Sequence, residues 1–180
     1  MTDTLTADPR YGGADPSPSQ LSRYLRTGAD PDLRRRRWVL GLSMAGVTIG
    51  QVVAAYQTGL LRHLPDPPVG PFDSDRVDAS DYAYQRAAMP DGLLMVLTYA
   101  VTAALTGAGG RDRARHRPVL PLLMAAKVAS DVGTNLALVR EEWGENKALC
   151  AWCQTATLAS AASLALVVPE ARRAWRHLRR

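Results

Sequence analysis

The sequence predicts an all-α fold, an integral membrane four-helix bundle. Four long apolar runs carry this prediction, at residues 38–61, 92–108, 119–139 and 147–168. The first run has 24 residues, which as a helix measure about 36 Å, and the hydrocarbon core of a bilayer is about 30 Å thick. The mean hydropathy of the whole chain is only -0.14 because long polar segments dilute these runs.

Three parts are predicted along the chain. Residues 1–33 hold several prolines, glycines and aspartates, so we expect a disordered cytoplasmic tail, with a short amphipathic helix around Tyr24 as the alternative. Residues 34–170 are expected to form the bundle, with a long polar outer loop at 62–91. Residues 171–180 are expected to form a basic cytoplasmic tail.

A basic cluster, Arg34–Arg37, leads into the first apolar run. Arginines before an apolar run also occur in twin-arginine export signals. Signal cores are usually about 7–15 residues long, and this longer run is followed by three more, so a membrane span is favoured. Small residues in this run leave room for close helix contact, and two glutamines are expected to face the bundle interior: Gly41, Ala45, Gly46, Gly50, Gln51 and Gln57.

Charge sets the predicted topology. The net charge is +5, and basic clusters lie before the first run, between the second and third runs, and after the fourth. Because basic residues stay on the cytoplasmic side, we expect a multi-pass protein of the cell inner (cytoplasmic) membrane with both termini cytoplasmic. Residues 62–91 and 140–147 would then face outward. Since the arginines lie beside apolar runs and aromatic residues are few, the lipid bilayer is the expected partner, and no nucleic acid.

Cys150 and Cys153 are the only cysteines, and they form a C-x-x-C motif where the fourth run begins. Residues three apart share a helix face. Backbone N–H groups at a helix start favour a thiolate, which Lys147 would support and Glu142 and Glu145 would oppose. The predicted topology places the pair at the outer membrane surface, where disulfides persist. The pattern therefore indicates catalytic, redox-active cysteines.

A metal site and an inert packing role are the alternatives for this pair. A structural zinc site takes four ligands, and the sequence offers no second cysteine pair, so we expect no metal. The three histidines lie elsewhere in the predicted topology, at His63, His116 and His177. Buried cysteines also pack as small apolar residues. An outward position at a helix start favours redox chemistry over packing.

Lys127, Asp131 and Asn135 are spaced four apart in the third run and therefore share one helix face. Charged groups inside a membrane usually face a polar interior. These residues either line a pocket for a polar head group or form an ion pair that ties helices together, and the sequence leaves both open. A small transporter is a further hypothesis, which four helices without an internal repeat disfavour.

Residues 36–168 resemble the vitamin K epoxide reductase family. The resemblance rests on the four apolar helices, the long outer loop and the C-x-x-C that opens the fourth helix. In the loop, Val77 is followed after three residues by Ser80, as in the family, and Pro90 matches the proline that opens the second helix.

The resemblance implies a membrane thiol–disulfide oxidoreductase coupled to a quinone cofactor. It implies that Cys153 faces the quinone and that Cys150 exchanges disulfides with a thioredoxin-like or other extracytoplasmic thiol protein. Thr157 stands where the family often has an aromatic residue. We expect Ser80, Thr157 and Asn135 to contribute to quinone binding.

The chain departs from the family in its outer loop, which normally carries two shuttle cysteines. The positions around Ser74 and Asp75 have no thiol, so the chain resembles a bacterial homologue without an internal relay. A partner protein would then have to reach Cys150 directly. The alternative function is a non-catalytic membrane bundle of the same fold that acts as a partner or assembly factor.

Overall fold

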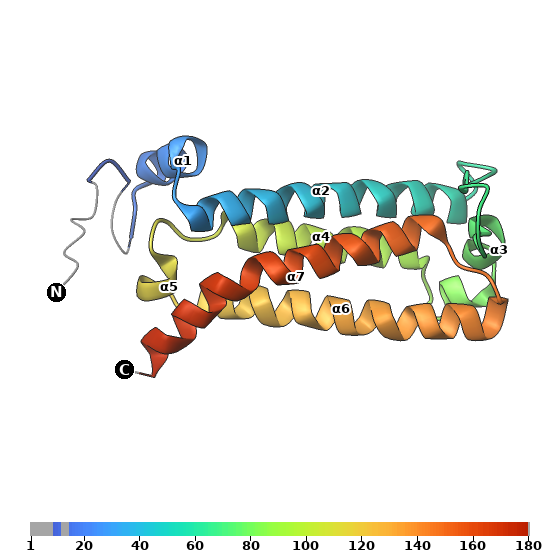
Figure 1. The fold of residues 1–180 in the computed structure, drawn as a ribbon. Coiled ribbons are helices and arrows are strands. Elements are labelled where there is room, and N and C mark those ends of the chain that lie inside the picture. The colour runs from blue at the N-terminus through green and yellow to red at the C-terminus, as the bar shows by residue number, and fades with distance from the viewer. Residues whose placement is uncertain (1–8, 12–14, 180) are drawn as a thin grey trace.

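Four long helices form the body of the computed structural model, which describes residues 9–11 and 15–179. They are α2 (Pro31–Gln57), α4 (Asp91–Gly107), α6 (Val119–Asn146) and α7 (Ala151–Leu178), and they lie side by side (Figure 1). The short elements are η1 (Pro9–Tyr11), α1 (Pro18–Thr27), α3 (Ser74–Asp78), η2 (Asp81–Tyr84) and α5 (Arg113–His116). Over this described part of the chain the only β-type pairing is an isolated bridge between Phe72 and Leu149, so the all-α prediction is confirmed.

Three helices of the described residues are long and apolar enough to cross a membrane: α2, α6 and α7. The fourth, α4, is apolar but has 17 residues, at the lower limit of the about 17–25 that a span requires. Figure 1 shows α1, α5 and the end of α7 at one end of the bundle and α3 at the other. The prediction of a membrane protein built from apolar helices is thereby confirmed.

The helices extend past the apolar runs that predicted them. Helix α2 starts at Pro31 because the carboxylate of Asp30 accepts the N–H of Leu33 at 3.0 Å and proline suits a first turn. Helix α6 continues through most of the predicted 140–147 loop and ends at Asn146, and its C-cap residue Lys147 has a φ of 52°. Helix α7 likewise continues through most of the predicted basic tail.

Within the predicted N-terminal tail, the structure has the alternative, a short helix. Helix α1 is capped by Ser17, whose hydroxyl accepts the N–H of Gln20 in a capping box. Tyr24 on this helix is buried, with 2% of its surface exposed. Residues 1–8 and 12–14 of the predicted tail lie outside the described residues.

Glycines allow α2 and α4 to approach each other closely. A Cβ atom on Gly92 would stand 2.6 Å from the backbone nitrogen of Ala54, and one on Gly46 would stand 2.6 Å from the ring of Tyr99. The sequence predicted this role for Gly46 but also for Gly41, where an added Cβ atom would meet no atom of another described segment within 4 Å. The prediction for Gly41 is therefore wrong.

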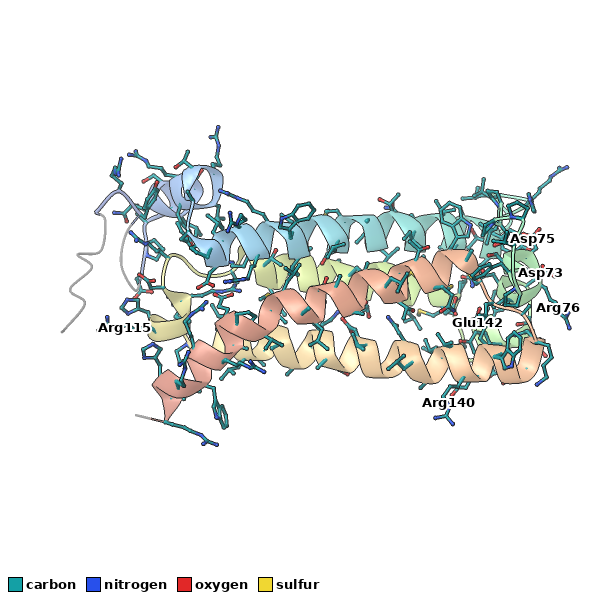
Figure 2. All side chains as sticks on the ribbon, viewed as in Figure 1. Asp73, Asp75, Arg76, Arg115, Arg140 and Glu142 are labelled. Carbon is teal, nitrogen blue, oxygen red and sulfur yellow. The ribbon has the colours of Figure 1, made fainter. Side chains whose placement is uncertain are left out.

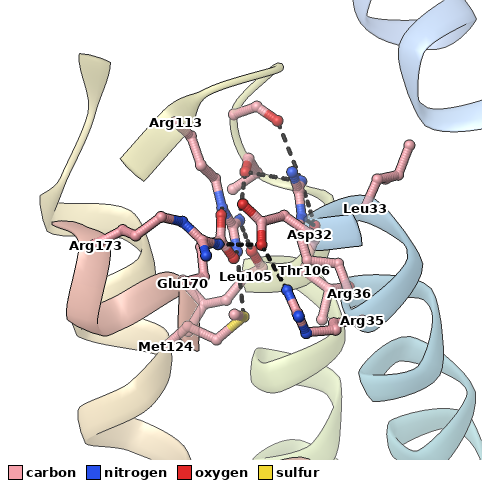
Figure 3. A network of polar contacts seen from close by, with 12 residues as sticks. Asp32, Leu33, Arg35, Arg36, Leu105, Thr106, Arg113, Met124, Glu170 and Arg173 are labelled. Atoms are coloured by element: carbon pink, nitrogen blue, oxygen red, sulfur yellow. Dashed lines mark hydrogen bonds and ion pairs between the residues drawn. The ribbon is translucent and has the colours of Figure 1, made fainter. Parts of the chain in front are cut away.

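Buried ionic contacts tie the helices together at the α5 end (Figure 3). Arg113 donates from Nε and Nη2 to the two carboxylate oxygens of Glu170, at 2.8 and 2.9 Å, and these side chains are 1% and 5% exposed. Arg36 donates from Nε to the carbonyl of Thr106 at 2.8 Å. Two arginines of the basic clusters are thus buried structural groups.

The connection between α2 and α4 packs against the start of α7. One buried cluster joins the two segments and consists of Val77, Tyr82, Ala83, Ala148 and Cys150. Figure 2 shows Asp73, Asp75 and Glu142 at this end of the bundle, and Arg115 at the opposite end. The predicted outer loop therefore covers the cysteine motif and carries acidic groups to it.

Candidate functional site

The cysteine pair opens α7. Cys150 is the N-cap residue, and its sulfur accepts the backbone N–H of Cys153 at 3.1 Å. Both cysteines are free thiols. Cys150 is completely buried, with 0% of its surface exposed, whereas Cys153 is partly exposed. The two sulfurs therefore share one helix turn, as the spacing predicts, but they have different surroundings.

The loop that precedes α4 encloses Cys150. The hydroxyl of Ser74 accepts the N–H of Ala151 at 3.0 Å and donates to the carboxylate of Asp66 at 2.6 Å. The backbone N–H of Asp73 donates to the carbonyl of Leu149 at 3.0 Å. These bonds hold the loop directly over the first turn of α7. Ser74 thus contacts the first turn of the cysteine helix.

Glu142, at the end of α6, closes the site from the other side. One of its carboxylate oxygens accepts the N–H of Cys150, and the other accepts from Nε2 of Gln154 at 3.1 Å. The side chain is buried. The sequence predicted only that Glu142 would oppose a thiolate, and the structure adds that both its oxygens are engaged by the cysteine turn.

Asp78 is a buried carboxyl beside the two sulfurs, and the sequence analysis did not assign it to the site. One of its carboxylate oxygens and the two cysteine sulfurs all lie within 4.8 Å of one another. Its Oδ1 accepts from Nε2 of Gln57 at 3.4 Å, while its Oδ2 has no hydrogen-bond partner among the described residues. Gln57 thus fulfils the predicted interior role, whereas Gln51 is exposed. Two thiols and one carboxylate are fewer ligands than a four-coordinate structural zinc site requires.

Burial and charge govern proton binding at this cluster. Burial raises the pKa of Asp78 to about 7; the adjacent Cys150 thiol opposes this rise, and the neighbouring carboxylates support it. The hydrogen bond with Cys153 lowers the pKa of the Cys150 thiol, but burial and the Asp78 carboxyl outweigh it and raise that pKa above its usual value. The expectation of a favoured thiolate at the helix start is therefore wrong for Cys150, because the helix terminus is covered.

A cavity of about 170 Å³ lies between α4, α6 and α7. Cys153, Thr157 and Asn135 line it, and Cys150 is not part of its lining. The hydroxyl of Thr157 donates to the carbonyl of Cys153 at 3.0 Å. Two of the three residues that the sequence proposed for cofactor binding therefore lie beside one cysteine at one cavity.

The other predicted polar residues lie apart from this cavity. Ser80 is not part of the cavity lining, and its hydroxyl donates to the carbonyl of Val77 at 2.6 Å. Lys127 donates to Asp131 at 2.6 Å and to the hydroxyl of Thr102 on α4 at 2.8 Å. This geometry favours the ion-pair interpretation of Lys127 and Asp131, because they join α6 to α4.

Asn135 lies near a second set of polar groups at the cavity. Its Nδ2 donates to the hydroxyl of Ser160 at 3.3 Å, and that hydroxyl lies 2.7 Å from the hydroxyl of Tyr99. All three side chains line the cavity. The cavity thus has the Cys153 sulfur and a group of amide and hydroxyl donors in its wall.

Comparison with known protein families gives one match. A family model described as "Vitamin K epoxide reductase family" matches residues 37–168. The match covers all of the long helices except the first turns of α2 and the last turns of α7, and it includes the loop and both cysteines. Comparison with curated proteins and with solved structures gave no match.

Proposed function

Because the chain belongs to the vitamin K epoxide reductase family, we propose that this multi-pass membrane protein passes electrons from a thiol protein through Cys150 and Cys153 to a quinone. One observation carries the proposal. Cys153 faces the cavity between α4, α6 and α7, whereas Cys150 lies outside it under the loop. The two sulfurs can therefore serve two different reactants.

The cavity fits the ring of a quinone. Apolar cavities of about 150 Å³ accommodate a benzene ring, and this one measures about 170 Å³. Quinone oxygens accept hydrogen bonds, and the amide of Asn135 in the cavity wall has a second N–H besides the one that it donates to Ser160. When bound, a quinone accepts two electrons and two protons. Asn135 would donate a hydrogen bond to it, and Ser160 and Thr157 would contact it in the wall beside Cys153.

The electron donor is proposed to be a thioredoxin-like or other extracytoplasmic thiol protein. The loop has no cysteine of its own, so a thiol of the partner must attack Cys150. Because Cys150 is completely buried, the loop held by Ser74 must move for this attack. The charge pattern supports an orientation with both termini in the cytoplasm and this loop outside.

The redox state of the pair in isolated membranes tests the proposal. Membranes are treated with a reductant or with menadione, the protein is denatured in acid, and free thiols are tagged with a maleimide of high mass. We expect the untagged, oxidised form to accumulate with the quinone. Single variants Cys150→Ala and Cys153→Ala identify the tagged bands, and Cys153→Ala should trap the partner in a mixed disulfide. A pair that keeps one redox state at every quinone level would refute quinone coupling.

A non-catalytic bundle is the second candidate, and the burial of Cys150 favours it. A partner or assembly factor of this fold needs the helices but not the two thiols. A Cys150→Ala, Cys153→Ala double variant that retains full cellular function would support this candidate over the enzyme. A transporter is disfavoured because Lys127 is engaged by Asp131 and by α4.

A further inference from the structure

Oxidation of this dithiol requires removal of protons from a buried place. When Cys150 and Cys153 form a disulfide, two S–H bonds break, one S–S bond forms, and two electrons and two protons leave. The Cys150 thiol has no exposed surface, so water does not reach it directly. Burial and the adjacent carboxyl also raise the pKa of this thiol, although the hydrogen bond with Cys153 lowers it. A proton acceptor within reach of the Cys150 sulfur is therefore needed.

Two buried carboxyls lie near Cys150, and only their contacts distinguish them. Both carboxylate oxygens of Glu142 are engaged, one by the Cys150 backbone and one by Gln154. Asp78 has one oxygen, Oδ2, with no hydrogen-bond partner in the described part of the chain, and its carboxylate lies within 4.8 Å of both sulfurs. A buried acceptor without a partner destabilises the fold, so its presence beside two thiols calls for an explanation.

We propose that Asp78 is the catalytic acid–base group of the dithiol, an inference that rests on the proposed function of the pair. During oxidation, the Asp78 carboxylate takes the proton of the Cys150 thiol, and the Cys150–Cys153 bond forms as both thiols lose their protons. The quinone takes up two electrons and two protons as its quinol, one of them the proton that Asp78 gives up, so Asp78 returns to its carboxylate form. When a partner dithiol reopens the disulfide, the Asp78 carboxylate first takes a proton from a partner thiol and then gives it to the Cys150 sulfur.

The surroundings of Asp78 adjust it for both directions of transfer. Burial raises the pKa of Asp78 to about 7, so that acid and carboxylate coexist at neutral pH. The ionisable groups that act on it, or on which it acts, come from every neighbouring element. They are the two thiols, the carboxyls of Asp66, Asp75, Asp91 and Glu142, and the phenols of Tyr56 and Tyr84. The neighbouring aspartates favour the protonated form of Asp78, and the adjacent Cys150 thiol opposes them.

The test compares full-length wild type with Asp78→Asn, Asp78→Glu and Asp81→Asn in lipid nanodiscs. Asp81 is an exposed carboxylate of the same loop and provides the matched control. One arm measures reduction of the disulfide by dithiothreitol, and the other measures oxidation of the dithiol by menadione or decylubiquinone, each across a pH series. Dithiothreitol ionises alike for all variants, so ratios of rates to wild type are compared.

We expect Asp78→Asn to slow both arms about 100-fold at neutral pH, as loss of a general acid–base group does. In the quinone arm the deficit should shrink as pH rises, because the thiol then ionises without help. Asp78→Glu should recover part of the rate, and Asp81→Asn should match wild type. A pH-independent ratio near one for Asp78→Asn in both arms would overturn the proposal.

Two further results distinguish a failure of the acid–base role of Asp78 from a failure of quinone coupling. If wild type reacts with dithiothreitol but with neither quinone, quinone coupling fails, while the dithiothreitol arm still decides the role of Asp78. If Asp78→Asn does not fold, the wild-type pH profile decides. That profile should contain an inflection near neutral pH besides the thiol ionisation, and its absence would overturn the proposal.

Discussion

Breaking the buried pair between Arg113 and Glu170 should cost the bundle several kcal/mol of stability, because one charge is then left buried without its partner. Glu170→Gln replaces one oxygen of the carboxylate by an NH₂ group of nearly the same size. The guanidinium, 1% exposed, then loses a charged acceptor for one of its two bonds of 2.8 and 2.9 Å and faces a donor instead. A bond to a charged group contributes about 1.5–3 kcal/mol, and breaking a buried pair costs about 3–5 kcal/mol. We expect a loss of about 3 kcal/mol in the free energy of unfolding.

The matched control is Glu141→Gln, which makes the same change of charge on the surface. Glu141 pairs with Arg86, and these side chains are 53% and 29% exposed. Exposed pairs contribute less than about 1 kcal/mol, so this variant should be nearly neutral. Unfolding is followed by circular dichroism as sodium dodecyl sulfate is added to dodecyl maltoside micelles. If Glu170→Gln costs no more than Glu141→Gln, the buried pair is not a structural tie and the reasoning fails.

Three further outcomes are expected. Gly92→Ala should lower the free energy of unfolding by about 2 kcal/mol in the same assay, because the added Cβ meets a backbone nitrogen of α2 at 2.6 Å. Gly41→Ala should be neutral or slightly stabilising, because its added Cβ meets no atom of another described segment within 4 Å. The pKa of Asp78 is raised from an ordinary 3.8 to about 7, so the folded state binds more protons than the unfolded state between these values. The contribution of Asp78 to stability is complete below the ordinary pKa and is lost as pH rises through about 7, so the stability of wild type relative to Asp78→Asn should fall over that window. A constant difference in stability between the two proteins would refute this prediction. Ser74→Ala removes the hydrogen bond from the loop to the first N–H of α7 and should speed maleimide labelling of the buried Cys150 thiol roughly tenfold. Ser80→Ala should not change the labelling rate, because the Ser80 hydroxyl bonds only within the loop. Equal labelling rates of the two variants would contradict the covering role of the loop.

The parts of the fold that sequence reasoning predicted are those that depend on local pattern. Apolar runs predicted the long helices, and the C-x-x-C at the start of the last run predicted a dithiol on a first helix turn. The resemblance to the family, placed on residues 36–168, agrees with the match over 37–168. Helix ends were less predictable, because capping by Asp30 and the φ of 52° at Lys147 do not depend on hydrophobicity.

The missed features depend on contacts between segments far apart in the chain. Asp78 lies in a polar loop, where an aspartate is ordinarily solvated, and its burial arises only when that loop packs against Cys150. Arg36 and Arg113 belong to basic clusters from which the membrane topology was predicted, yet tertiary contacts bury both. One signal was available for Asp78, since it lies inside the valine–serine spacing that carried the resemblance.

The two ends of the bundle bury charge in different ways, and this contrast points to the reactive end. At the α5 end, Arg113 and Glu170 satisfy each other with two bonds. At the α3 end, Asp78 keeps a buried oxygen without a partner among the described residues, beside two thiols. Asparagine at that position would remove the burial of a titrating carboxyl while keeping its size, so Asp78→Asn should be more stable than wild type at neutral pH in mixed micelles although it is slower in thiol exchange. If Asp78→Asn were both less stable and slower than wild type, Asp78 would instead be a structural support of the loop. A group that serves proton transfer at the expense of stability must, when it is replaced, raise the stability and lower the rate of thiol exchange.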